Sequence, residues 1–194
     1  MYGLDALTVG ENIESNLVKW EPNQIISEIT EDAVMWATDG IDDRSVAFAA
    51  RMMEQDVEVR IVDKDAVLSG HKLSRGSVVV IAMDNPEINN LPDMIKEVSE
   101  ELNIAIMSLE SGFGPEELPD WGGRHFRLLE KPQIAMLSHE GFNSYDVGVS
   151  LWSIDHHLGI RHSQLNASLA SYGDLRRYNT CLLYTSPSPR DQLT

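Results

Sequence analysis

An unbroken apolar run at residues 77–82 is the feature that most constrains the fold of this chain. Three consecutive valines and an isoleucine lie in it, from Val78 to Ile81. β-Branched residues in such a run are typical of a strand that is buried on both faces. The sequence therefore predicts that residues 77–82 form a central strand of a sheet.

Residues on both sides of this run complete the pattern of a small α/β unit. Asp42 or Asp43 can cap a helix, and residues 57–62 alternate apolar and charged residues, as a strand with one solvent-exposed face does. The apolar face of this first helix is predicted to contain Val46, Ala50 and Met53. A second helix is predicted from apolar residues at helical spacing, which are Leu91, Ile95, Val98 and Leu102. Residues 104–109 return as a strand. This order predicts a compact α/β unit over residues 41–110, in which the helical crossover favours parallel pairing of the last two strands.

The segments on either side of this unit carry weaker patterns. Residues 1–40 are acidic and weakly periodic, with Trp20 and Trp36 as candidate anchors, and we expect them to be a connector. Residues 111–130 are rich in glycine and proline, which interrupt regular structure, so we expect a linker there.

A second α/β pattern over residues 131–180 predicts the first β-α-β of a flavodoxin-like, doubly wound sheet, truncated at its third strand. Residues 133–137 are a short apolar strand, and residues 160–165 form the next one. Ser144 can cap the helix between them, and Gly159 is a natural helix end. The buried face of this helix is predicted to contain Val147, Leu151, Ile154 and Leu158.

The character of the chain changes at its C-terminal end. Residues 176–180 lead toward a third strand, but residues 181–191 match one reading frame of a sequencing adapter, and the remainder would come from its index. We therefore expect residues 181–194 to be an adapter-derived artefact, so that the natural segment stops near Thr180, within a domain. The alternative is a polar, proline-rich tail.

Composition excludes several classes of function. Asp and Glu number 31 against 15 Lys and Arg, which gives a net charge of −16. So acidic a surface argues against binding of nucleic acid or of an anionic membrane. No stretch approaches the ~20 apolar residues of a membrane-spanning helix. The single cysteine, Cys181, lies in the tail, so the preceding residues have no disulfide and no thiolate nucleophile or metal ligand.

The loop at residues 138–143 is the best-placed candidate for a binding site. Ligands of open α/β sheets bind beyond the carboxyl ends of the strands, and this loop follows the first strand of the second pattern. His139, Glu140, Asn143 and Tyr145 are its candidate pocket residues. The alternative is that these are solvated loop residues, and no catalytic residue is predicted among them.

Histidines near residue 156 invite a metal interpretation, which their spacing does not support. His156 and His157 are neighbours on a helix, so their side chains point about 100° apart and cannot both face one ion. His157 and His162 lie on opposite sides of the predicted helix end. Surface histidines are the prediction here, and no metal site is predicted in the chain.

Four segments in order resemble a known family. These are residues 76–80, 119–129, 132–137 and 177–179, and they resemble the C-terminal half of large bacterial zinc carboxypeptidase-like proteins. In that family a peptidase domain is followed by a class I glutamine-amidotransferase-like domain. The resemblance covers residues 40–180 and implies a parent enzyme that uses zinc-bound water to cleave the C-terminal peptide bond of a peptide or protein substrate. It also implies that the parent is exported, to the periplasm or outside the cell.

The zinc and its ligands are expected outside this chain. The family's ligands include a His-x-x-Glu pair, and none of the six histidines here has Glu three residues later. The resemblance therefore implies a non-catalytic C-terminal part of a zinc metallocarboxypeptidase-like protein, with no cofactor of its own. One alternative is a free-standing flavodoxin-like or amidotransferase-like ligand-binding module. Another is a working glutamine amidotransferase, whose nucleophilic cysteine would follow Thr180.

Overall fold

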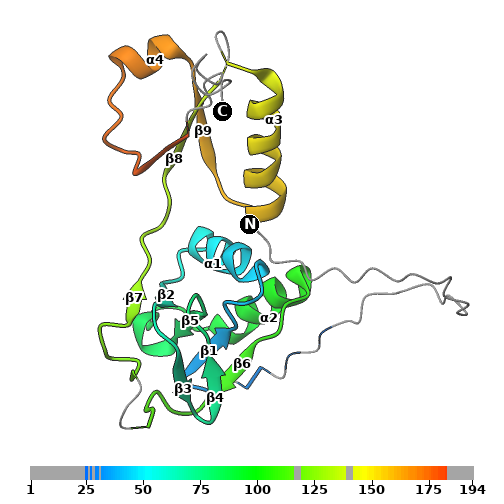
Figure 1. Ribbon diagram of the computed structural model, residues 1–194, viewed down its shortest axis with the longest axis vertical. Coiled ribbons are helices and arrows are strands. Elements are labelled where there is room, and N and C mark those ends of the chain that lie inside the picture. The colour runs from blue at the N-terminus through cyan, green and yellow to red at the C-terminus, as the bar shows by residue number, and fades with distance from the viewer. Residues whose placement is uncertain are drawn as a thin grey trace, which may run out of the picture.

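The computed structural model describes residues 25, 27, 29, 30, 32–115, 119–138 and 142–182. It has a mixed α/β fold, as the sequence predicts, with a five-stranded antiparallel sheet, a two-stranded hairpin and a three-stranded parallel sheet (Figure 1). We call residues 32–130 the antiparallel unit and residues 131–182 the parallel unit. None of the helices in the described ranges has the length and hydropathy needed to span a bilayer.

The antiparallel unit is built from short strands and two longer helices. Its elements are β1 (Met35–Thr38), α1 (Arg44–Glu54), β2 (Val59–Val62), β3 (Ala66–Leu68), β4 (His71–Leu73), β5 (Val78–Ile81), the 3-10 helix η1 (Ala82–Asp84), α2 (Leu91–Leu102), β6 (Met107–Leu109) and β7 (Phe126–Leu128). The order in the five-stranded sheet is β6-β1-β5-β2-β7, so the apolar run at β5 is central, as predicted. All four residues of β5 are buried.

The sheet of the antiparallel unit is covered on both faces. Trp36 and Val80 face α1 and α2, where they pack with Phe48 of α1 and Ile95 of α2. The alternate residues of β1 and β5 face the β3–β4 hairpin and the segment that leads to β7. Those residues are Met35, Ala37, Val79 and Ile81. Because side chains alternate along a strand, one apolar run supplies both cores.

Strand β1 corrects two expectations. Residues 1–40 were expected to be a connector, yet β1 pairs antiparallel with β5 on one side and β6 on the other. Strands β5 and β6 were expected to pair in parallel. They point the same way, but β1 lies between them, so they do not pair. A strand buried on both faces shows no polar alternation, and β1 has only four residues, so its local pattern is weak.

Strand β7 and the hairpin are further additions to the expected pattern. Residues 126–128, expected within a linker, pair with β2 at the edge of the sheet. Strands β3 and β4 are joined by Ser69 and Gly70, whose φ angles of 49° and 79° are both left-handed. Two such residues make the tight turn that matches the twist of a hairpin.

The first helix buries two of its three predicted apolar positions. Ala50 and Met53 are buried as expected, but the side chain of Val46 is 59% exposed. Phe48 and Met52, one helical turn apart, point into the core instead. The second helix matches its prediction, with Leu91, Ile95 and Val98 buried.

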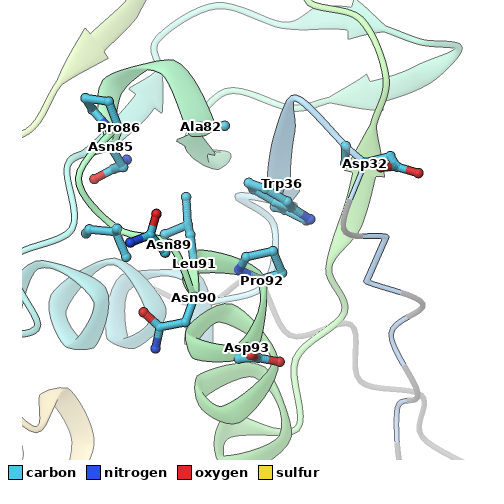
Figure 2. A pocket seen from close by; sticks show the side chains of 12 residues that line it. Asp32, Trp36, Ala82, Asn85, Pro86, Asn89, Asn90, Leu91, Pro92 and Asp93 are labelled. Atoms are coloured by element: carbon cyan, nitrogen blue, oxygen red, sulfur yellow. The ribbon is translucent and has the colours of Figure 1, made fainter.

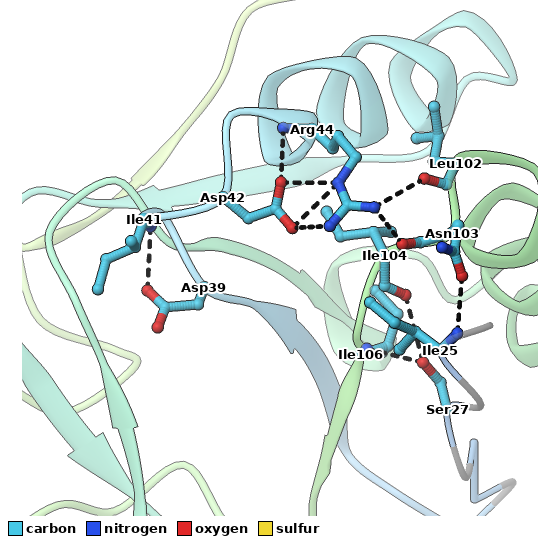
Figure 3. Close-up of polar contacts among 10 residues, drawn as sticks. All are labelled: Ile25, Ser27, Asp39, Ile41, Asp42, Arg44, Leu102, Asn103, Ile104 and Ile106. Carbon is cyan, nitrogen blue, oxygen red and sulfur yellow. Dashed lines mark hydrogen bonds and ion pairs between the residues drawn. The ribbon is translucent and has the colours of Figure 1, made fainter. Parts of the chain in front are cut away.

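A segment before β1 runs beside the edge strand β6 (Figure 3). The amide of Ile25 donates to Oδ1 of Asn103 over 2.7 Å. The amide of Ile106 donates to Oγ of Ser27 over 2.9 Å, and that hydroxyl donates to the carbonyl oxygen of Ile104. These contacts satisfy backbone groups that precede an edge strand.

The parallel unit contains the predicted β-α-β. Its elements are β8 (Ile134–Leu137), α3 (Ser144–Trp152), the π-helix η2 (Ser153–Leu158), β9 (His162–Leu165), α4 (Ala167–Tyr172) and β10 (Thr180–Leu182). Strand β8 pairs in parallel with β9 and with β10, so the strand order is β10-β8-β9. The helix ends at Gly159 as predicted, with φ of 68°. Of the predicted stripe, Val147 and Ile154 are buried.

Strand β10 includes two residues from the segment expected to be adapter-derived. Cys181 and Leu182 lie opposite Ala135 and Met136 of β8. Backbone hydrogen bonds require no particular side chain, so residues of adapter origin can pair with β8 as natural residues would.

The two units meet through α1. Ala50 of α1 packs with Ile134, Ile154 and Ile160 of the parallel unit. Arg51 of α1 pairs with Glu101 of α2 and also donates to the carbonyl oxygen of His156 over 3.3 Å. In Figure 1 this helix lies on the side of the antiparallel unit that faces α3 and η2.

Candidate functional site

The carboxyl edge of the parallel sheet is the site predicted from the sequence. Strand β8 ends opposite Leu165 of β9, and Ser138 follows it as a buried residue. The amide of Ser138 donates to the carbonyl oxygen of Leu165 over 2.9 Å, and its hydroxyl donates to Oε1 of Gln164 over 3.4 Å. Ser138 therefore links β8 to β9. His139 and Glu140 lie outside the described residues.

Asn143 and Tyr145 stand at the start of α3. Oδ1 of Asn143 accepts a hydrogen bond from the amide of Tyr145 over 3.0 Å, so Asn143 is the N-cap that the sequence assigned to Ser144. The side chain of Tyr145 is 85% exposed. A pocket role for these two residues stays a prediction.

The histidines near η2 are spread around the helix end. His156 packs its ring against Trp152, with ring centroids 5.7 Å apart. Nδ1 of His162 lies 3.4 Å from Oδ1 of Asp155, within ion-pair distance but without the geometry of a hydrogen bond. Within the described residues, no group of three or more His, Cys, Asp or Glu side chains is arranged to hold a metal ion.

A cavity of about 540 Å³ opens beside α2 in the antiparallel unit (Figure 2). Its lining consists of Asp32, Ala33, Trp36, Ala82, Asn85, Pro86, Ile88, Asn89, Asn90, Leu91, Pro92 and Asp93. The side chain of Asn85 is buried, and its hydrogen-bonding groups are already paired with the main chain. It donates to the carbonyl oxygens of Glu58 and Ile81 and accepts from the amide of Glu58. The exposed amides and carboxylates on the rim give a wide polar depression rather than a catalytic arrangement.

A second cavity, of about 490 Å³, lies where the two units meet. Its lining consists of Glu54, Lys131, Pro132, Gln133, Ile134, Arg161, His162, Ser163, Arg177 and Tyr178. Apart from Glu54, these residues precede or begin β8, β9 and β10, so the cavity lies at the amino edge of the parallel sheet. We call it the amino-edge cavity.

Ion pairs tie the wall of the amino-edge cavity to α1. Nζ of Lys131 lies 2.7 Å from Oδ1 of Asp56, and this hydrogen bond holds the pKa of Asp56 below its ordinary value. Arg161 pairs with Glu54, and the hydrogen bond from that pair raises the pKa of Arg161. Each pair joins the parallel unit to the end of α1.

Comparison with protein-family models, with curated proteins and with solved structures gave no match. The function of the chain is therefore argued from its own residues.

The amino-edge cavity is the feature that the sequence analysis missed. The predicted site lies at the carboxyl ends of the strands, where ligands of doubly wound sheets bind. A signal was present, because Arg161 and His162 are adjacent in the chain, as are Arg176 and Arg177. Basic residues that cluster before two predicted strands of an acidic chain indicate a local positive surface.

Proposed function

We propose that this chain is a non-catalytic C-terminal part of a zinc carboxypeptidase-like protein, and that its parallel unit begins a flavodoxin-like, class I amidotransferase-like domain. The antiparallel unit is then the support that precedes this domain. The substrate of the parent protein is a peptide or protein, cleaved at its C-terminal peptide bond, and the parent is exported.

The parallel pairing of β8 with β9, with Thr180 on the other side of β8, is the observation that carries the proposal. A flavodoxin-like sheet begins with its first strand in the interior, its second strand on one side and its third on the other. Strand β8 lies between β9 and β10, and both pairings are parallel. The connection from β8 to β9 runs through α3 and η2, which is the crossover such a sheet requires.

The role of the chain in the parent protein is structural. Within the described residues no group of His, Cys, Asp and Glu side chains fits a zinc ion, so this proposal places the zinc ligands elsewhere in the parent protein. Both faces of the antiparallel sheet are covered, and α1 holds the parallel unit through Ala50 and Arg51. A rigid two-part support of this kind positions a neighbouring domain without contributing to its chemistry.

A free-standing ligand-binding module is the second candidate function. The amino-edge cavity favours it, because its volume of about 490 Å³ is in the range of small-molecule sites and its lining combines apolar and polar residues. In that case the chain binds a small molecule by itself and has no peptidase domain.

Long-read sequencing across the gene, followed by expression of the whole protein, tests the proposal. We expect an upstream His-x-x-Glu motif with a later histidine, zinc bound in the purified protein, and release of C-terminal residues from a test peptide. Deletion of residues 25–182 should leave the zinc content unchanged, since the ligands lie elsewhere. A gene that begins at Met1 and encodes no such motif would contradict the proposal and leave the binding module.

A further inference from the structure

Two residues that line the amino-edge cavity each have a buried polar atom without a hydrogen-bond partner among the described residues. These atoms are the hydroxyl of Tyr178 and Nδ1 of His162. The His162 side chain is only 10% exposed, and its neighbour Asp155 approaches within 3.4 Å without hydrogen-bond geometry. Buried polar groups in proteins are nearly always paired, so two unpaired groups next to one cavity point to a missing partner.

The charges around this cavity favour an anion as that partner. Its lining carries three permanent cations, Lys131, Arg161 and Arg177, against the single carboxylate of Glu54. Lys131 and Arg161 are already paired with carboxylates. This local excess of positive charge stands out in a chain whose net charge is −16.

Arg177 is the cation best placed to bind a ligand. No carboxylate among the described residues lies within ion-pair distance of its guanidinium. The nearby carboxylate of Asp174 is engaged by Arg176 over 2.7 Å. The guanidinium of Arg177 lies instead over the ring of Tyr178, 4.7 Å from its centroid, which leaves its N–H donors available at the ring edge.

We propose that the amino-edge cavity binds a small organic anion through its carboxylate or phosphate group. Arg177 donates to two oxygens of this group, as guanidinium does in bidentate pairs. A shift of the Tyr178 and His162 side chains toward the cavity lets their buried donors reach the same group, because oxyanions only accept hydrogen bonds. The cavity is much larger than one oxyanion, and Pro132 and Ile134 give its wall an apolar part for the rest of the molecule.

Titration of the full chain with two minimal probes tests this proposal. Inorganic phosphate and acetate are added separately in a low-chloride buffer, and binding is followed by calorimetry and by the imidazole NMR signals of His162, assigned with His162→Gln. We expect at least one probe to bind and to shift those signals. The stronger of the two probes identifies the head group.

Two variants test the proposed contacts, and a third is the matched control. Arg177→Gln should lower the affinity for the bound probe about tenfold, and Tyr178→Phe, which keeps the ring, about threefold. Arg75→Gln removes the same charge from an exposed residue of the antiparallel unit that does not line the cavity, and should bind as the unchanged chain does. Absence of binding by both probes, equal binding by Arg177→Gln, or an equal loss in Arg75→Gln would overturn the proposal.

Discussion

The guanidinium of Arg44 donates a hydrogen bond to the main-chain carbonyl oxygen of Asn103 over 2.5 Å, so the first residue of α1 closes the C-terminal end of α2 (Figure 3). The last carbonyl groups of a helix have no partner within it and carry partial negative charge. A cation that donates to them therefore stabilises the C-terminal end of α2 and ties it to the start of α1.

Removal of this contact should destabilise the antiparallel unit. We expect Arg44→Ala to lower the free energy of unfolding by about 1–2 kcal/mol, a value reduced for the partial exposure of the side chain. Arg44→Lys keeps the charge but lacks the planar fork, so its loss should be smaller. Urea unfolding followed by tryptophan fluorescence measures both, and an Ala variant as stable as the unchanged chain would refute this role.

The partner of Arg44 predicts a pH dependence. Asp42 accepts hydrogen bonds from the side chain of Arg44 over 2.6 Å and 2.9 Å, and these hold the pKa of Asp42 below its ordinary value of 3.8. Because the folded-state pKa is lowered, this stabilisation is present above the unfolded-state pKa and is lost as the pH falls through the folded-state pKa.

Replacement of this carboxylate isolates its contribution. Asp42→Asn should be less stable than the unchanged chain at pH 7, by at most about 1 kcal/mol, and the difference should shrink below about pH 4. Unfolding curves at pH 7, 5 and 3 measure it, with Glu97→Gln on the exposed face of α2 as a control. A difference that stays constant with pH would argue against the ion pair.

The side-chain amide of Asn85 should contribute more to stability than the side-chain amides of its exposed neighbours. Asn85 is 6% exposed and makes three hydrogen bonds to the main chain of β2 and β5 and their borders, so Asn85→Ala leaves three groups unpaired. We expect a loss of about 2–4 kcal/mol in the free energy of unfolding. Asn89→Ala, on the same cavity rim but exposed, should change it by less than about 0.5 kcal/mol. Equal effects would show that the buried network does not stabilise the fold.

Two glycines should respond to alanine in opposite directions. A Cβ on Gly40 would lie 2.2 Å from the carbonyl carbon of Gly76, so the backbone must move and Gly40→Ala should lower the melting temperature by several degrees. A Cβ on Gly148 meets nothing within 4 Å, and Gly148 lies in α3. Gly148→Ala should raise the free energy of unfolding by about 0.5–1 kcal/mol. Thermal melts of both variants check the pair.

The parallel unit should not fold well by itself. Ala50 of α1 covers Ile134, Ile154 and Ile160, and a sheet of three short strands also has two open edges. Residues 131–182 expressed alone should give a broad melt and poorly dispersed amide signals. Residues 25–130 should keep a cooperative melt, because their two cores are complete. A sharp melt of the isolated parallel unit would show that it needs no support from α1.

The local elements of this chain follow from its sequence. The apolar run at β5, the helical spacing of Leu91, Ile95 and Val98, and the glycine that ends η2 are short-range patterns, and each forms the predicted structure. Side-chain periodicity reports which face of a helix or strand is buried, so it needs no knowledge of distant residues. The prediction of two α/β patterns in one chain rests on the same information.

Tertiary structure alone decided how these elements pair. Strand β1 separates β5 from β6, and β10 pairs with β8, because backbone hydrogen bonds join residues that no local pattern connects. The amino-edge cavity has the same origin, since Lys131, Arg161 and Arg177 come together only when three strands start side by side against α1. Residue spacing determined α2, β5 and the end of η2, whereas long-range pairing determined β1 and β7, the order of the sheets and the place where the charges meet.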